Sequence, residues 1–134
     1  MWALNWDSTN GLKTSSVDEV IQKINELNQE YKDKQPIIIE IESDTRKSLT
    51  LGVGVIGGLS CLTYFPFPDG LGSMHLISTD KLGLNHGESI IFWLNSYDSE
   101  WAIEDLVTYE EAMDEVLYFL QNNDIDADLN WEKD

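Results

Sequence analysis

The chain has 134 residues with 25 Asp and Glu against 8 Lys and Arg, which gives a formal charge of −17 at neutral pH. A charge of this sign and size excludes nucleic acid and anionic membranes as direct partners, and it accelerates encounter with a basic partner. The length suits one domain. A hydrophobic content of 42%, which includes five Trp, is too high for a disordered acidic tail. We therefore expect residues 1–134 to form a single folded domain.

Several local features bear on the location of the protein. The first residues lack a basic stretch followed by an apolar run, so we expect no secretory signal and a cytoplasmic protein. The longest weakly polar stretch, residues 49–62, is too short and too rich in glycine to span a bilayer. Cys61 is the single cysteine, so it forms no intrachain disulfide and no thiolate metal cluster, and its apolar neighbours predict a buried, inert thiol.

The first half of the chain predicts one helix among strands. Ser16 and Glu19 form a candidate capping box, in which the hydroxyl and the carboxylate satisfy two free backbone N–H groups at a helix start. Gly57 and Gly58 suit a two-residue hairpin loop because both can adopt positive φ. The prolines and glycine of residues 65–70 predict a loop. The expected helix is 17–31, and the expected strands are 2–6, 37–41, 48–56 and 59–65.

The second half predicts a second helix, which Thr108 and Glu111 open with another capping box. The expected range of this helix is 109–122. A loop through Gly83, Asn85 and Gly87 is expected before the strand 89–94. The expected strands are 72–77, 89–94, 101–107 and 128–131. Strands joined by tight turns, rather than strict β–α alternation, predict an α+β fold: a mainly antiparallel twisted sheet of about six to eight strands with two helices packed on one face.

No catalytic or cofactor pattern in the sequence is complete. The glycines of residues 52–57 match the letters of a dinucleotide fingerprint, but no helix follows to hold a pyrophosphate. His86 and Glu88 match half of a zinc deaminase site, whose Pro-Cys-x-x-Cys half is missing. No nucleophile elbow or Cys/His arrangement is present. We therefore expect a non-catalytic protein without a cofactor or a metal centre.

One aspartate pattern leaves a weak alternative open. Asp124, Asp126 and Asp128 alternate as in a calcium loop, but the central glycine and the distal bidentate glutamate are missing. Weak binding of a divalent cation at these residues is therefore retained as an alternative.

The distribution of charge is the most informative feature of the chain. Between Lys81 and Lys133 there are 51 residues without Lys or Arg, and they include 13 Asp and Glu. Residues 98–134 have a net charge of −12, whereas residues 1–97 have −5. Solubility or adaptation to a salt-rich cytosol would explain a general acidity. A local excess favours a surface that meets a cationic protein or ligand.

Acids on the second predicted helix suggest where that surface lies. The pairs Glu110–Asp114 and Glu111–Glu115 stand four residues apart, opposite the expected core stripe, and each like-charged pair destabilises a helix by roughly 0.2–0.5 kcal/mol. Trp101 lies among acids on the preceding segment, where it is either an interface anchor or a core residue. The predicted contact residues are Asp98, Glu100, Trp101, Glu104, Asp105, Glu110, Glu111, Asp114 and Glu115.

The pattern of core hydrophobics and glycines over residues 36–131 resembles a known family. The chain is similar to the immunity proteins of bacterial polymorphic toxin and contact-dependent inhibition systems, in particular to the first-numbered immunity family, which is often encoded beside deaminase-type toxins. The resemblance rests on the run from Leu49 to Gly54 and on Tyr64, Phe92, Ile103, Val107, Ala112, Phe119, Leu120 and Trp131.

The resemblance implies that the chain binds a cognate toxin domain, a deaminase or nuclease that is basic around its nucleic-acid channel. Three alternatives remain. The chain could be a nucleic-acid mimic that inhibits another DNA- or RNA-binding protein, a small ligand-binding protein or enzyme with a carboxylate site, or an acidic scaffold without a partner. The sequence does not decide whether the acidic helix or the opposite sheet face makes the contact, and it is silent on oligomeric state.

Overall fold

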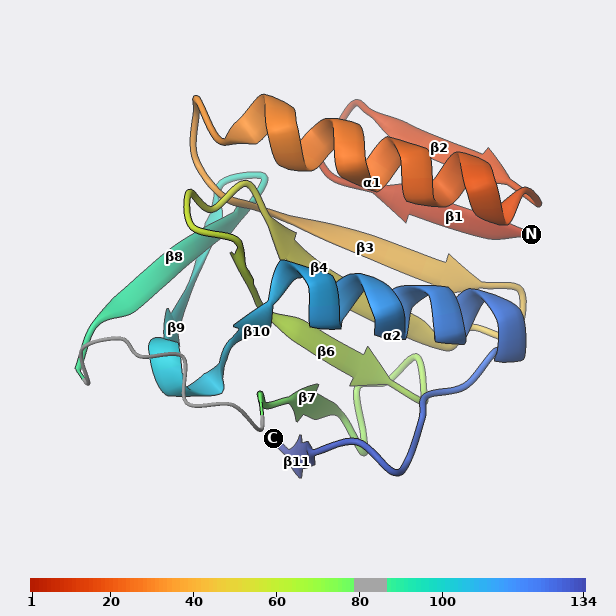
Figure 1. The fold of residues 1–134 in the computed structure, drawn as a ribbon. Coiled ribbons are helices and arrows are strands. Elements are labelled where there is room, and N and C mark those ends of the chain that lie inside the picture. Colours follow the sequence, from red (N-terminus) through yellow and green to blue (C-terminus); the bar gives the residue numbers. More distant parts are fainter. Residues whose placement is uncertain (79–86) are drawn as a thin grey trace.

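The structure is a computed structural model, and it describes residues 1–78 and 87–134. Its two helices, α1 (Val17–Tyr31) and α2 (Tyr109–Asn122), pack on one face of a mainly antiparallel sheet (Figure 1). The predicted α+β class is therefore confirmed. The expected loop residues Gly83 and Asn85 and the half-motif residue His86 lie outside the described residues.

Nine strands form the main sheet of the described residues, slightly more than the six to eight predicted. Its order is β11-β7-β6-β4-β3-β1-β2, with β8 beside β3 and β9 beside β8. Strands β5 (Leu59–Ser60) and β10 (Val107–Thr108) form a second, two-stranded sheet. The strands of the main sheet are β1 (Trp2–Asn5), β2 (Gly11–Thr14), β3 (Ile37–Ser43), β4 (Ser48–Val53), β6 (Leu62–Phe65), β7 (Met74–Leu76), β8 (Ser89–Leu94), β9 (Tyr97–Ala102) and β11 (Trp131–Lys133).

The main core lies between the sheet and the two helices. In β3 the buried residues Ile37, Ile39 and Ile41 alternate with Ile38 and the carboxylates that follow it, because successive strand side chains point to opposite faces. The first set joins the core with the inner faces of both helices. The second set therefore lies on the face of the sheet that the helices leave uncovered.

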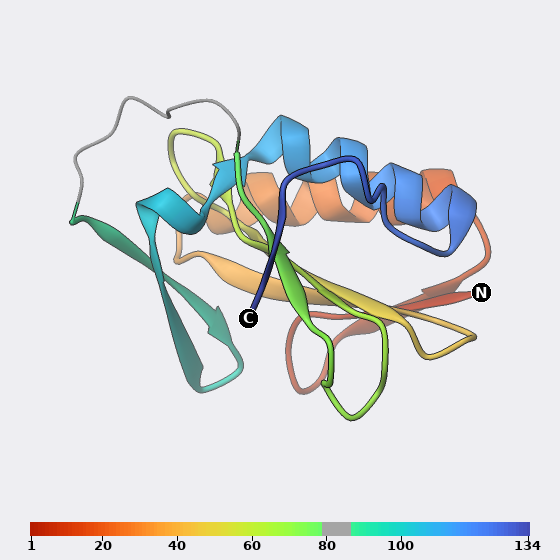
Figure 2. The same cartoon turned by 90° about the horizontal axis from the view of Figure 1, so that it is seen from below.

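The β8–β9 hairpin and the loop of residues 66–73 project from the sheet on the side away from the helices, as does the connection between β1 and β2 (Figure 2). The hairpin and the loop of residues 66–73 form two walls on the uncovered sheet face. No helix among the described residues is long and apolar enough to cross a membrane.

The start of α1 differs in part from its prediction. Ser16 Oγ accepts the N–H of Glu19 at 3.2 Å, as a capping box requires. The Ser16 N–H, however, donates to Thr14 Oγ1 at 3.0 Å instead of to the Glu19 carboxylate. The short strand β2 places Thr14 beside this N–H, and sequence reasoning missed β2.

The strand boundaries near the glycines and at the end of the chain were also wrong. Gly57 and Gly58 do adopt positive φ, of 102° and 75°, but the connection is longer than a two-residue hairpin. Strand β4 ends at Val53 and pairs with β6, while β5 leaves the hairpin to pair with β10. The last strand is β11, three residues beyond the predicted start, because it pairs with β7.

Gly52 and Cys61 pack tightly beneath the β8–β9 hairpin. A Cβ at Gly52 would lie 2.6 Å from Cys61 Sγ and closer still to the Phe92 ring, so only glycine fits between them. Burial raises the pKa of the Cys61 thiol to about 12. The predicted burial of Cys61 is confirmed, and close packing explains why a glycine stands at position 52.

Candidate functional site

Helix α2 presents two exposed acids in its first two turns. Thr108 Oγ1 accepts the Glu111 N–H, and Glu111 Oε1 accepts the Thr108 N–H, both at 3.1 Å, so this predicted capping box is confirmed. The cap sets the start of the helix, and the buried stripe of Ala112, Val116 and Phe119 sets its rotation about the core. Glu110 and Asp114, one turn apart, consequently lie on the side that faces α1.

A groove of about 1140 Å³ lies between α1 and α2. Its floor is apolar: Ile21 and Met113 are half-buried against the core, and Leu117 is 38% exposed. The Tyr109 hydroxyl donates to Asn25 Oδ1 at 2.6 Å and so joins the two helices beside this floor. Four exposed carboxylates line the groove, namely Asp18, Glu26, Glu110 and Asp114. We call this surface the helix groove; an apolar centre with a polar rim is typical of protein interfaces.

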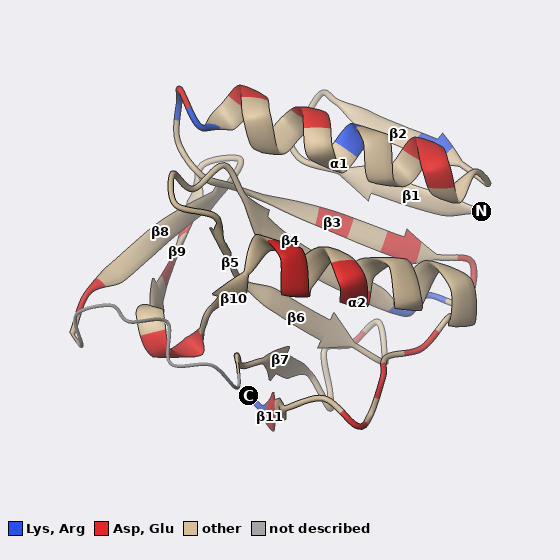
Figure 3. Cartoon of the chain, in the orientation of Figure 1, with Lys and Arg blue, Asp and Glu red and all other residues tan. Residues whose placement is uncertain are grey.

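The charge of the helix groove is barely compensated within the chain. Acidic residues lie on both helices, and α2 contains no Lys or Arg (Figure 3). On α1, Lys23 lies 3.3 Å from the Glu26 carboxylate and 5.6 Å from the centre of the Trp6 ring. One lysine therefore offsets one of the four rim acids, and the groove retains a negative field.

The β8–β9 hairpin carries three further residues of the predicted contact, and it separates them. Asp98 and Glu100 are exposed on one side of β9, whereas Ser99 and Trp101 alternate with them and line a different cavity. The Trp101 indole N–H donates to Ser99 Oγ at 3.0 Å, and the ring packs partly against the core. Trp101 therefore lies on the other side of β9 from Asp98 and Glu100, and its role as a contact residue stays a prediction.

Glu104 and Asp105 lie on a short 3₁₀ turn, Ile103–Asp105, rather than on the predicted strand 101–107. Asp105 Oδ1 is 3.7 Å from His75 Nε2, and the other ring nitrogen of that histidine is 2.6 Å from Asp134 Oδ1. These contacts join β7, the 3₁₀ turn and the segment after β11. The separation from Asp105 is too long for a hydrogen bond, and the buried His75 Nε2 has no hydrogen-bond partner among the described residues.

Glu111 is also engaged within the fold. In addition to its part in the cap, its Oε1 accepts the Ser78 hydroxyl at 2.9 Å. The carboxylate therefore fixes the segment after β7 against the start of α2, which reduces its capacity to meet a partner.

The burial of Glu115 contradicts the prediction that this residue lies on the helix face opposite the core stripe. It is 2% exposed, and its Oε1 accepts the N–H of Asp126 at 2.8 Å. Burial, and then the nearby carboxylates of Asp126 and Asp124, raise its pKa to about 7 against the lowering effect of that hydrogen bond. The segment after α2 folds back over this side of the helix, so Glu115 belongs to no exposed contact surface.

The alternating aspartates after α2 have local partners. Asp124 Oδ1 accepts the N–H of Ile125 at 2.8 Å, and Asp126 Oδ1 accepts the N–H of Asp128 at 3.0 Å. These bonds stabilise turns between α2 and β11. No group of three or more His, Cys, Asp or Glu arranged to hold a metal ion occurs within the described residues.

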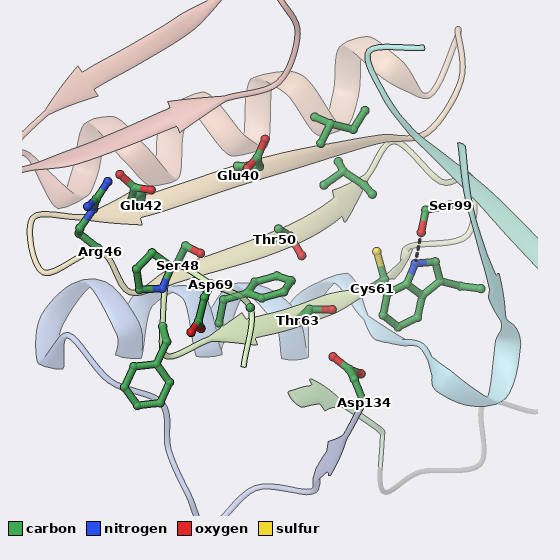
Figure 4. Close-up of a pocket in the computed structure, with 17 residues that line it drawn as sticks. Glu40, Glu42, Arg46, Ser48, Thr50, Cys61, Thr63, Asp69, Ser99 and Asp134 are labelled. Carbon is green, nitrogen blue, oxygen red and sulfur yellow. Dashed lines mark hydrogen bonds between the residues drawn. The ribbon is translucent and has the colours of Figure 1, made fainter. Parts of the chain in front are cut away.

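A second concave surface lies on the face of the sheet that the helices leave open. Sequence reasoning kept this face as an alternative contact but did not identify the cavity on it. This cavity of about 770 Å³ lies over β3, β4 and β6, between the β8–β9 hairpin and the loop of residues 66–73 (Figure 4). We call it the sheet groove. Its lining includes the carboxylates of Glu40, Glu42, Asp69 and Asp134 and one cation, Arg46.

A signal for the sheet groove was present in the sequence. The alternation of isoleucine with glutamate in residues 37–42 assigns Glu40 and Glu42 to the face opposite the core. The cross-strand register then sets Glu40 beside Thr50, and Thr50 beside Thr63. The walls of the groove come from residues distant in sequence, and no local pattern indicates them.

No model of a known protein family matches the chain, and no curated protein matches its sequence. The resemblance to the immunity family therefore stays a prediction.

Proposed function

We propose that the chain is a cytoplasmic, non-catalytic immunity protein that binds and neutralises a cognate, basic toxin domain acting on nucleic acid, a deaminase or nuclease. One observation carries the proposal: the helix groove combines an apolar floor with four exposed carboxylates on a chain of charge −17. The resemblance to the immunity family supplies the class of partner.

The proposed partner has a basic surface that matches the acidic helix groove. A domain that acts on nucleic acid needs basic residues along the channel that holds the phosphates. Glu110 and Asp114 present carboxylates to such a surface, and the negative field of the whole chain steers its approach. Ile21, Met113 and Leu117 then provide the apolar area that a stable contact requires.

The first test is capture of the partner. The tagged full-length chain is used as bait in lysate of the producing strain, and bound proteins are identified by mass spectrometry at low and then moderate salt. The proposal expects one small basic nuclease or deaminase domain that survives moderate salt. Recovery of many basic proteins that wash away together would contradict it.

A charge-reversal experiment locates the contact. Combining Glu110→Lys with Asp114→Lys should weaken toxin binding roughly 100-fold or more and reduce its salt dependence, because two close charge pairs become repulsive. Asp98→Lys with Glu100→Lys is the matched control, since it changes the charge equally on the hairpin. The control should slow association only modestly. Equal effects of both double variants on affinity would rule out the helix groove as the contact.

The nucleic-acid mimic remains a distinct alternative. A mimic should bind several unrelated basic proteins with similar affinity, whereas an immunity protein should ignore a non-cognate toxin of the same fold. Binding of cognate and non-cognate domains, compared at one salt concentration, separates the two functions.

A further inference from the structure

The sheet groove contains a carboxylate that the fold leaves without compensation. Glu40 is half-buried, and burial, followed by the nearby charge of Glu42, raises its pKa. No hydrogen bond or ion pair joins its carboxylate to another described residue. An incoming cation would relieve both the desolvation and the repulsion.

The rest of the lining supplies oxygen acceptors and more negative than positive charge. Thr50 lies beside Glu40, and Thr63 lies beside Thr50 on the next strand. Asp69 comes from the loop and Asp134 from the segment after β11 (Figure 4). Four carboxylates thus face one guanidinium, that of Arg46. The groove attracts cations and repels phosphates.

Aromatic residues shape the groove for a flat cation. Trp101 lines one wall, and Phe65 and Phe67 line the opposite side. A guanidinium stacks on aromatic faces and also donates paired hydrogen bonds to a carboxylate, whereas an ammonium is a strongly hydrated point charge. The combination of aromatic faces with carboxylates therefore favours arginine over lysine.

The rims of the groove indicate a macromolecule rather than a free small cation. The two projecting segments carry large exposed hydrophobics at their ends: Phe67 is 58% and Leu71 68% exposed on the loop, and Tyr97 is 75% exposed on the hairpin. A single amino acid within the groove would leave these side chains in water. A protein segment that crosses the groove would cover them, and exposed aromatics of this kind are frequent anchors in protein contacts.

We propose that the sheet groove is a docking site for an arginine-bearing segment of a protein partner, with the arginine between Glu40 and the aromatic wall formed by Trp101. The site is distinct from the helix groove on the other face of the sheet. The inference goes beyond the proposed function and does not depend on it.

The test follows the amide signals of the ¹⁵N-labelled full-length chain by NMR in about 150 mM salt, where long-range attraction is screened. The probe is the peptide acetyl-Gly-Arg-Gly-Arg-Gly-amide. It should shift the Trp101 indole signal and the backbone amides of Thr50 and Thr63. The lysine version should bind more weakly, and the citrulline version, which keeps the shape without the charge, should produce no shifts.

Two variants test whether the peptide binds at Glu40. Glu40→Gln should weaken peptide binding roughly tenfold, the contribution of one charge-assisted hydrogen bond. Glu26→Gln removes the same charge from the helix groove and should leave the shifts unchanged. Shifts confined to α1 and α2, or equal effects of the two variants, would overturn the inference. So would free L-arginine binding as tightly as the peptide, since the site would then serve a small molecule.

The result of the peptide experiment can be separated from the result of the toxin-binding experiments. Toxin binding that depends on Glu110 and Asp114 while the peptide leaves the sheet groove unaffected would overturn this inference alone. Peptide binding in the sheet groove without any captured toxin would overturn the immunity function alone.

Discussion

Glu115 shows that a residue which belongs to an acidic pattern in the sequence can be buried in the fold. It lies on α2 four residues after Glu111, a spacing that predicts two neighbouring surface acids. In the fold, its carboxylate instead accepts the N–H of Asp126 and is almost fully buried. The residue therefore organises the turn after α2, at the cost of keeping an ionisable group out of water.

We expect Glu115→Gln to raise the stability of the chain at pH 8. The folded-state pKa of about 7 lies above the ordinary value of 4.5, so between these values the unfolded chain loses a proton that the folded chain keeps. The contribution of Glu115 to stability is thus most favourable below about pH 4.5 and is lost as pH rises through about 7. The glutamine can still accept the Asp126 N–H.

Thermal unfolding at pH 4, 6 and 8 checks this expectation. The variant should melt a few degrees higher than the natural chain at pH 8, and its stability should fall less between pH 4.5 and 7. The same pH profile in both proteins would show that Glu115 is not the titrating group.

At the scale of the element, α2 combines a well-capped N-terminus with like-charged surface residues that destabilise the helix. Its capping box satisfies two backbone N–H groups, and the acids of the first turn suit the positive end of the helix dipole. Asp114 lies beyond that turn, where it gains little from the dipole and repels Glu110. A sequence shaped only for helix stability would place a basic residue there.

The substitution Asp114→Lys should therefore move stability and binding in opposite directions. Replacing a like-charged pair by an attractive one should stabilise the chain by roughly 0.5 kcal/mol. The same change should weaken binding of a basic partner in the helix groove. Urea unfolding measures the first effect, with Asp128→Lys as the control that makes the same charge change outside any helix. An Asp114→Lys variant no more stable than this control would argue against the repulsion.

At the scale of the whole molecule, negative charge covers both faces of the sheet. The helix groove and the sheet groove each have an excess of carboxylates, and they contain different residues from distant parts of the chain. The excess in residues 98–134 is thus distributed in space, through α2, the hairpin, the 3₁₀ turn and the turns after α2. Such a distribution gives a long-range field and also strains the folded state by self-repulsion.

Salt should consequently stabilise the chain even without a partner. Between about 10 mM and 500 mM NaCl the screening length falls several-fold, so the free energy of unfolding should rise. The variant with Asp98→Lys and Glu100→Lys is four charge units less negative and should respond less. A flat response in both proteins would mean that self-repulsion is insignificant.

The sequence by itself determined the features that depend on neighbouring residues. The cap formed by Thr108 and Glu111 and the apolar periodicities of residues 17–31 and 109–122 give both helices, because helix starts and helix faces are set within a few residues. The alternation in residues 37–42 gives a central strand for the same reason. The net charge and its concentration in residues 98–134 also follow from the sequence alone.

Only the tertiary structure decided which of these residues share a surface. Glu115 became buried because the segment after α2 folds over it, and Trp101 turned away from its acidic neighbours because the β9 register set its side of the hairpin. The sheet groove exists because the hairpin, the loop of residues 66–73 and three strands meet on one face. Such contacts join residues far apart in the chain, and their geometry depends on packing of the whole fold, which local patterns do not encode.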